Sequence, residues 1–267
     1  EARRTGKKIN VVKNIMDVEQ FEEMTIEKMQ GKTRAYLKIQ EGCNQYCSYC
    51  IIPYARGRIR SRRLKDIVNE VKRLSEHGFK EVVLTGIHVA SYGVDLQNNT
   101  LLDAIHKVHN IKGIERIRLS SIEPTIMTKE FVEELSKHKK VCPHFHLSLQ
   151  SGCDETLNRM KRKYTTYEYD KVVNRLRNVW PDVSITTDIM VGFPGETREE
   201  YEKTLSFAEK IQFSEIHVFK YSARKGTPAA NYPNQINGAI KQERSEKLLD
   251  LARKSSIAFR KKFLGTS

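Results

Sequence analysis

Three cysteines lie within eight residues in the stretch Gly42-Cys43-Asn44-Gln45-Tyr46-Cys47-Ser48-Tyr49-Cys50. Thiolates grouped in this way select an iron–sulfur cluster, zinc or copper(I). A structural zinc site needs four protein ligands, and no fourth cysteine or histidine lies at the usual spacing. A cubane cluster normally takes four thiolates, so three would leave one iron open to another ligand. The alternatives are three free cysteines in a loop, or zinc with a distant fourth ligand.

Short apolar runs alternate with amphipathic segments on both sides of this stretch. The runs are rich in Val, Ile, Leu, Phe and Thr, as buried parallel strands are, and cover 35–40, 81–84, 116–119, 144–149, 184–191 and 215–220. Apolar stripes at helical spacing lie within 64–74, 101–108, 131–135, 169–176 and 201–211, and a long basic helix is expected over about 241–263. Capping boxes begin two helices, Thr165 with Glu168 and Thr197 with Glu200.

Six strand–helix units predict an α/β fold with a parallel sheet and right-handed crossovers. Because six units are fewer than the eight of a closed barrel, we expect a partial (β/α)6 TIM-like barrel. A doubly wound flat sheet is the competing architecture. No Gly-x-Gly-x-x-Gly follows the first strand, which counts against a dinucleotide-binding version of that sheet. In either fold, the chemistry is expected at the C-terminal ends of the strands.

The spacing Cys-x-x-x-Cys-x-x-Cys, with the aromatic Tyr49 before the last cysteine, closely resembles the signature of the radical S-adenosylmethionine (SAM) superfamily. The resemblance implies that Cys43, Cys47 and Cys50 hold three irons of a [4Fe–4S] cluster and that SAM chelates the fourth. It further implies that one electron cleaves SAM to methionine and a 5′-deoxyadenosyl radical, which abstracts a hydrogen atom. In such enzymes the cofactors carry the difficult step and the protein orients them.

Longer stretches resemble the methylthiotransferase family within this superfamily. They are 41–62 (EGCNQYCSYCIIPYARGRIRSR), 84–93 (LTGIHVASYG), 149–152 (LQSG), 188–196 (DIMVGFPGE) and 221–230 (YSARKGTPAA). The resemblance is closest to the tRNA branch that adds a methylthio group to C2 of N6-threonylcarbamoyladenosine next to the anticodon. A methylthiotransferase acting on N6-isopentenyladenosine or on a ribosomal protein remains an alternative. A non-catalytic, cluster-bearing RNA-binding module is an alternative of another class.

The family resemblance also implies a division into domains. Residues 1–33 are expected to be a linker or lead-in segment, and 34–267 the radical SAM domain. Family members add an N-terminal domain that holds a second [4Fe–4S] cluster and a C-terminal RNA-binding domain. We expect both to be absent from this chain, so the second cluster would belong only to the full-length enzyme.

Composition indicates the partners. The 267 residues carry 47 Lys and Arg against 33 Asp and Glu, a net charge of +14 that suggests a polyanionic partner such as nucleic acid, or a basic surface without a partner. The family resemblance implies that this partner is tRNA. No signal peptide and no apolar run of about 18 residues is present, so we expect a cytoplasmic protein without a membrane partner. A reducing electron donor and a monomeric state are also expected.

Polar and glycine residues at the predicted strand ends are the candidate cofactor contacts. The expected SAM-binding residues are Tyr49, Gly86, His88, Glu123, Gln150, Asp188, Val191 and Gly192. An unpaired carboxylate inside a strand is costly, so Asp188 is expected to line the cavity or to pair with a neighbour. Candidate contacts to substrate or RNA phosphates are Arg56, Arg58, Arg60, Arg62, Arg162 and Arg224. No side chain is expected to act as a catalytic acid or base.

Overall fold

A computed structural model describes residues 14–23 and 33–266. Its strands are β1 (Arg34–Glu41), β2 (Arg60–Ser61), β3 (Glu81–Gly86), β4 (Arg116–Leu119), β5 (His144–His146), β6 (Ser184–Val191) and β7 (Glu215–Lys220). Its α-helices are α2 (Ile52–Arg56), α3 (Leu64–Glu76), α4 (Leu101–His109), α5 (Lys129–Ser136), α6 (Asp154–Arg159), α7 (Thr166–Val179), α8 (Arg198–Ile211) and α9 (Gly238–Lys261). Short 3-10 turns are η1 (Ile15–Asp17), η2 (Val89–Ser91), η3 (Pro124–Ile126) and η4 (Pro228–Asn231).

The parallel strands follow chain order across the sheet. One part has the order β2-β1-β3-β4 and the other β5-β6-β7, and every pairing except that of β1 with β2 is parallel. Isolated parallel bridges, Ile117 with Val141 and Ile122 with Leu147, connect β4 to β5. A doubly wound sheet would reverse its strand order partway across. The predicted partial barrel is therefore confirmed, with β2 as a short antiparallel addition.

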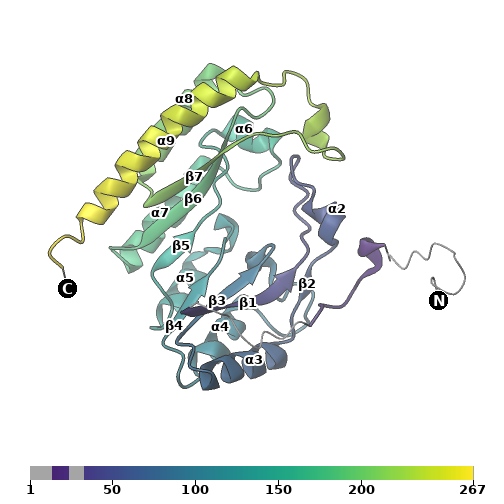
Figure 1. The fold of residues 1–267 in the computed structure, drawn as a ribbon, viewed down its shortest axis with the longest axis vertical. Coiled ribbons are helices and arrows are strands. Elements are labelled where there is room, and N and C mark those ends of the chain that lie inside the picture. Colours follow the sequence, from purple (N-terminus) through teal and green to yellow (C-terminus); the bar gives the residue numbers. More distant parts are fainter. Residues whose placement is uncertain (1–13, 24–32, 267) are drawn as a thin grey trace, which may run out of the picture.

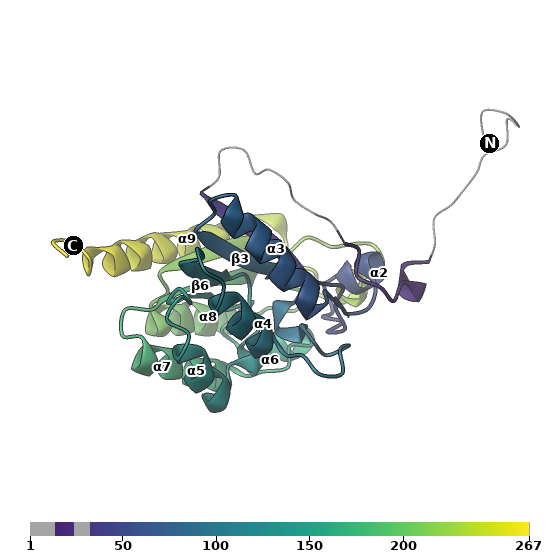
Figure 2. The same ribbon diagram turned by 90° about the horizontal axis from the view of Figure 1, so that it is seen from below.

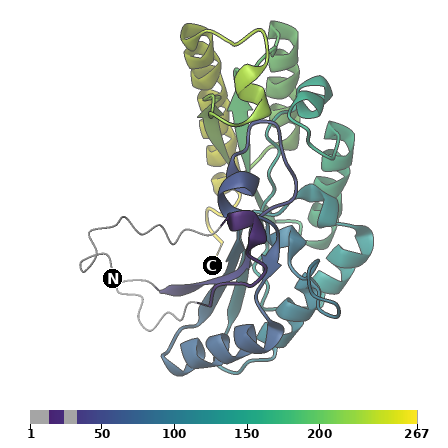
Figure 3. The ribbon, with the colours of Figure 1, turned by 90° about the vertical axis from the view of Figure 1, so that its right-hand side faces the viewer.

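Helices cover the outer face of the curled sheet, and no helix of the described residues lies over its concave face. Figure 3 shows the helices following the strands in a crescent, and Figure 2 shows α3, α4, α5 and α7 side by side along it. Alternate strand residues, such as Leu37, Leu84 and Ile189, are buried in the core beneath these helices. Their neighbours on the strands point to the concave face, so Lys38 and Asp188 are only partly buried.

Helix α9 lies against β7 and β6, at the end of the sheet farthest from β2 (Figure 1). Its N-terminus is capped by the side chain of Asn237, which accepts a hydrogen bond from the backbone of Ala239. Tyr201 of α8 donates to the carbonyl of Arg244 at 2.7 Å, which ties the two helices together. None of the helices in the described ranges combines the length and apolar character that a membrane crossing requires.

The predicted elements agree with the structure except at a few boundaries. The strand expected over 144–149 ends at His146 and the one expected over 81–84 continues to Gly86. The two predicted capping boxes are confirmed, and a third, Thr100 with Asp103, begins α4. Helices α2 and α6 and strand β2 are too short to give a clear period, which explains why the sequence did not reveal them.

The expected lead-in segment lies mostly outside the described residues. Its described part, 14–23, packs against the domain. Lys38 lies over the ring of Phe21 at 5.0 Å, and Glu23 pairs with Arg62 at 2.7 Å. This part of 1–33 therefore contributes contacts to the fold.

Candidate cofactor-binding site

The cysteine loop folds back at the C-terminal end of β1. Gly42 has a φ of +70°, and a Cβ at this position would lie 1.8 Å from the carbonyl oxygen of Arg58. Cys43 donates its backbone N–H to the carbonyl of Gly57 at 3.1 Å, and Cys50 donates to that of Cys47 at 3.0 Å. The glycine thus lets the loop lie directly against the segment that follows α2, which fixes where the thiols point.

The three thiols face one cavity. Cys43, Cys47 and Cys50 line a space of about 150 Å³, and none of them is in a disulfide. Burial raises the pKa of Cys43, and the negative charges of Cys47 and Cys50 raise it further. Burial also raises the pKa of Cys50, with Cys47 adding to the effect. Thiolates this close repel one another unless a cation lies between them, so the donor set fits three irons of a [4Fe–4S] cluster.

Glu123, which follows β4, is the centre of a buried polar network beside the thiols. Its Oε2 accepts a hydrogen bond from Nε2 of Gln45 at 2.8 Å and lies 2.7 Å from Nε2 of His88. Its Oε1 pairs with Nη2 of Arg162 at 3.1 Å. Burial raises the pKa of this carboxyl, but the hydrogen bond from His88 and the charge of Arg162 outweigh burial and lower it. Glu123 is therefore a carboxylate that orients three neighbours.

Arg162 brings a positive charge to the cysteines. Its Nη1 donates to the sulfur of Cys47 at 3.4 Å, and its Nε donates to the hydroxyl of Tyr164 at 3.0 Å. The guanidinium also lies over the Tyr164 ring at 5.0 Å. Because its side chain is only 9% exposed, its attraction to thiolates is weakly screened by water.

Two glutamines that were not among the predicted site residues, Gln40 and Gln45, hold this network. Gln40, fully buried at the end of β1, accepts a hydrogen bond from the backbone of His88 at 2.7 Å and donates to the carbonyls of Glu41 and Gly42. A Cβ on Gly86 would lie 2.8 Å from Oε1 of Gln40, so this glycine makes room for the contact. A polar residue at the last position of the strand predicted over 35–40 was the available signal.

Half of the predicted SAM contacts line the cavity with the cysteines: Tyr49, His88, Glu123 and Gln150. The other four, Gly86, Asp188, Val191 and Gly192, are not among the lining residues. Val191 is fully buried, and the Gly192 backbone donates to Glu196 at 2.7 Å. The carboxylate of Asp188 pairs with His146 at 3.2 Å, in agreement with the expectation that it either lines the cavity or pairs.

Of the six predicted arginines, Arg162 faces Glu123 and Cys47, and the other five separate into two groups. Arg56, Arg58 and Arg224 are exposed, whereas Arg60 and Arg62 are buried, their side chains only 4% exposed. Arg60 donates to the carbonyls of Arg56 and Arg58 and lies 3.6 Å from Glu41.

Arg62 pairs with Glu23 and Glu70. The assignment of Arg60 and Arg62 to RNA phosphates is corrected, because both side chains are buried and carboxylates or carbonyls already occupy both guanidiniums.

Replacing Glu123 by glutamine should lower the free energy of unfolding of the cluster-free protein by about 3–5 kcal/mol, since it leaves Arg162 buried without its carboxylate. Because the folded-state pKa of Glu123 is lowered, its contribution is complete above the unfolded value of about 4.3 and disappears as the pH falls through the folded-state pKa. Urea unfolding of both proteins at several pH values measures the difference.

The matched control is Glu134→Gln, because Glu134 is half-exposed and pairs with Lys137 on the surface. Its effect should stay within about 0.5 kcal/mol. A loss of the same small size for Glu123→Gln would show that the buried network is not stabilising.

Comparisons with known proteins agree with this site. Residues 37–208 match the radical SAM superfamily. The chain is 42% identical over 251 residues to a threonylcarbamoyladenosine tRNA methylthiotransferase (MtaB) of Bacillus subtilis, covering 94% of this chain and 56% of that protein. It is also 42% identical over 250 residues to a tRNA-2-methylthio-N(6)-dimethylallyladenosine synthase of Thermoanaerobacter sp., covering 93% and 52%. The chain thus spans about half the length of the curated relatives it matches.

A solved structure has the same fold. TsrM, a radical SAM methyltransferase from Kitasatospora setae with cobalamin and a [4Fe–4S] cluster bound, superposes with a TM-score of 0.62 at 20% identity, covering 73% of this chain and 38% of that one. The superfamily match extends over more than half of the chain and includes all three cysteines. The protein therefore belongs to the radical SAM superfamily, whose members use a [4Fe–4S] cluster and SAM, and the relatives that it matches in sequence are tRNA methylthiotransferases.

Proposed function

We propose that this chain is the radical SAM domain of a tRNA methylthiotransferase that modifies C2 of N6-threonylcarbamoyladenosine next to the anticodon. One observation carries the enzymatic part of this proposal. Three unpaired cysteines, a carboxylate and a buried arginine line one cavity at the ends of parallel strands, in a chain that is 42% identical to such enzymes. When bound, the cluster and SAM supply the radical that removes a hydrogen atom from an unactivated carbon.

The residues of the chain hold and orient these cofactors. Cys43, Cys47 and Cys50 would each bind one iron, and Arg162 beside Cys47 would offset the negative charge of the cluster. Tyr49, His88 and Gln150 line the remaining space and offer a ring, an imidazole and an amide to SAM. A reducing electron donor and, in the full-length enzyme, a second [4Fe–4S] cluster complete the proposal.

Cleavage of SAM tests the enzymatic function against the non-catalytic alternative. The protein, reconstituted anaerobically with iron and sulfide and then reduced with dithionite, should release 5′-deoxyadenosine from SAM. Chromatography of the products, with Cys47→Ala as the control, measures this release. If the wild-type protein holds its cluster but forms no more 5′-deoxyadenosine than Cys47→Ala, the non-catalytic alternative is preferred.

The choice of adenosine depends on the chemistry of its N6 group. The dimethylallyl group is an apolar branched chain, whereas threonylcarbamoyl carries a carboxylate. Burying a carboxylate requires a cation or several N–H donors, and an arginine fork suits it bidentately. Relatives of both kinds match at the same identity, so the proposal for threonylcarbamoyl depends on which arginines lie near the mouth of the cavity.

Arg224 is the candidate partner for this carboxylate. It lies exposed in the loop after β7, where its carbonyl accepts hydrogen bonds from Thr227 at 2.8 and 3.1 Å. The same loop contacts the cysteine loop, because Ala229 donates to the carbonyl of Ser48 at 2.8 Å. Gly226 also approaches the side chain of Ile51, next to Cys50. Arg224 is therefore carried by a segment that rests on the cysteine loop.

Replacing Arg224 by alanine in the full-length enzyme should reduce the preference for threonylcarbamoyladenosine over isopentenyladenosine tRNA by about 10-fold or more, since a hydrogen bond to a charged group contributes about 1.5–3 kcal/mol. Competition between two tRNAs that differ only in the N6 group, read as methylthiolated nucleoside by mass spectrometry, gives the ratio.

The control is Lys225→Ala, which removes a neighbouring exposed cation. Wild-type enzyme that prefers the isopentenyl tRNA would contradict the substrate proposal. A preference that survives in Arg224→Ala would contradict only the role of Arg224.

A further inference from the structure

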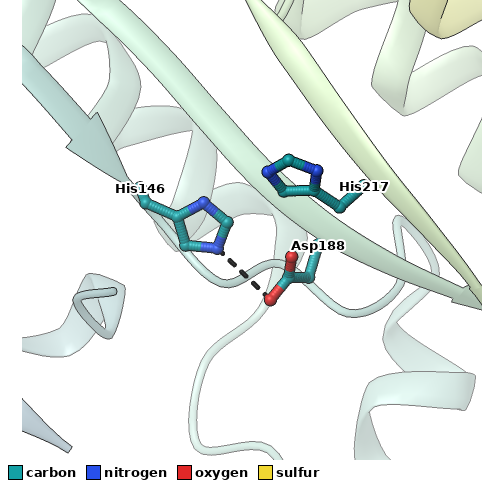
Figure 4. A group of neighbouring side chains, drawn as sticks. All are labelled: His146, Asp188 and His217. Atoms are coloured by element: carbon teal, nitrogen blue, oxygen red, sulfur yellow. Dashed lines mark ion pairs between the residues drawn. The ribbon is translucent and has the colours of Figure 1, made fainter. Parts of the chain in front are cut away.

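A second group of metal-ligating side chains lies on the concave face of the sheet. His146 of β5, Asp188 of β6 and His217 of β7 come from three adjacent strands (Figure 4). In the parallel register, Asp188 lies opposite His217, and His146 lies opposite Thr186, two residues before Asp188. One ligand atom from each residue lies within 4.8 Å of the others. None of the three lines the cysteine cavity.

The environment of His146 leaves one ring nitrogen available. Its Nδ1 lies 2.9 Å from the hydroxyl of Thr186, so the ring can donate its proton there. Its Nε2 is buried, has no hydrogen bond of good geometry to any described residue, and faces Oδ2 of Asp188 at 3.2 Å. A histidine that binds a metal through one nitrogen almost always donates the other N–H to an oxygen in this way. With the proton on Nδ1, Nε2 and the carboxylate are both acceptors, and a cation between them would satisfy both.

The distances suit a small divalent ion. Metal–ligand bonds of about 2.0–2.1 Å in a tetrahedron place neighbouring ligand atoms about 3.3 Å apart. The observed 3.2 Å between His146 and Asp188 is already close to this value. His217 stacks on His146 with ring centroids 5.7 Å apart, and its side chain is 47% exposed, so the ring has room to turn. A movement on the order of 1 Å by this ring would complete a three-ligand set.

The geometry points to a binding site for one divalent transition-metal ion, held by His146, Asp188 and His217. Two imidazoles and one carboxylate suit zinc, cobalt or iron(II), and three protein ligands leave further positions open toward the concave interior of the barrel. Glu215, whose carboxylate lies 4.0 Å from His217, adds negative charge beside the site. The cysteine cavity lies just beyond the C-terminal end of β5, since Ser148, two residues after His146, is one of its lining residues. This site is independent of the proposed methylthiotransferase reaction.

Zinc binding to the cluster-loaded protein tests the site, because its cluster cysteines are already occupied. After a chelator wash, titration calorimetry should show one zinc ion bound per chain by the wild type. His146→Gln and Asp188→Asn should each weaken binding by more than 100-fold, and Thr186→Val, which removes the partner of Nδ1, by about 10–100-fold. The matched control is His144→Gln, because His144 lies on the same strand but outside the three-residue group.

A measurement on the wild-type protein alone does not depend on whether the variants fold. Crystals of the wild type soaked in zinc should show an anomalous scattering peak between the three side chains. No zinc binding by the wild type, or equal binding by Asp188→Asn and wild type, would overturn the proposal and leave His146 and Asp188 as an ordinary ion pair. A peak located only at Cys142 or Cys153, the cysteines outside the cluster loop, would overturn it equally.

Discussion

Replacing Cys43, Cys47 or Cys50 by alanine should abolish cluster binding. Wild-type protein reconstituted anaerobically and washed with chelator should hold about four irons per chain, as one cubane requires, whereas each variant should hold fewer than one. Each of these thiols lines the cavity and none has another sulfur partner, so no described cysteine stands ready to replace a lost ligand. Iron and sulfide analysis, together with the visible absorption of the cluster, measures the loss.

The controls are Cys142→Ala and Cys153→Ala, which should retain the cluster. Cys142 belongs to the connection between β4 and β5, where its backbone donates to Ile117. The thiol of Cys153 donates to Glu155 at the start of α6. Uptake of one zinc per chain without iron, or loss of iron in either control, would contradict the assignment of the three ligands.

Gly42→Ala should disrupt the cluster loop although it leaves every ligand in place. A Cβ here would lie 1.8 Å from the backbone oxygen of Arg58 and 2.8 Å from that of Gly57, which are rigid neighbours. The left-handed backbone alone costs an alanine about 1 kcal/mol, and relieving the clash must also move the loop that carries Cys43. We expect the variant to lose most of its cluster and to unfold at a lower temperature.

The matched control is Gly78→Ala. Gly78 also has a positive φ, +87°, but a Cβ there would have no atom within 4 Å. It should therefore show only the backbone cost and keep its iron. Equal iron content in the two variants would show that the contact between Gly42 and Arg58 does not position the ligands.

The sequence predicted most of the fold because its signals are local. β4, β6 and β7 were predicted with their observed boundaries, since alternation and β-branched residues mark them directly. The end of β5 was missed because the apolar alternation continues through Leu147 and Leu149, whereas beyond His146 only isolated bridges at Leu147 and Gln150 continue the pairing. The three cysteines were recognised because they are neighbours along the chain.

The rest of the site depends on contacts between distant residues. Glu123 was identified from its place at a strand end, but its pairing with Arg162 joins two loops that only the folded sheet brings together. Arg60 and Arg62 were predicted to contact RNA phosphates because they belong to a run of arginines that follows the cysteine loop. Their burial depends on Glu41 and Glu70, whose inward orientation could not be read from composition or period. His146, His217 and Asp188 likewise converge only through strand register.

Few backbone hydrogen bonds connect β4 to β5, and this joint between the two parts of the sheet should affect the dynamics of the protein. Continuous ladders connect the strands on either side, whereas this joint has only the bridges at Ile117 and Ile122. We expect the amide protons there to exchange with solvent sooner than those of β3 or β6, because local opening starts where backbone bonds are fewest. Glu123 and Arg162 lie on opposite sides of this joint. Opening it would separate the two, so a ligand held by both sides should slow the exchange and make the two halves unfold as one cooperative unit.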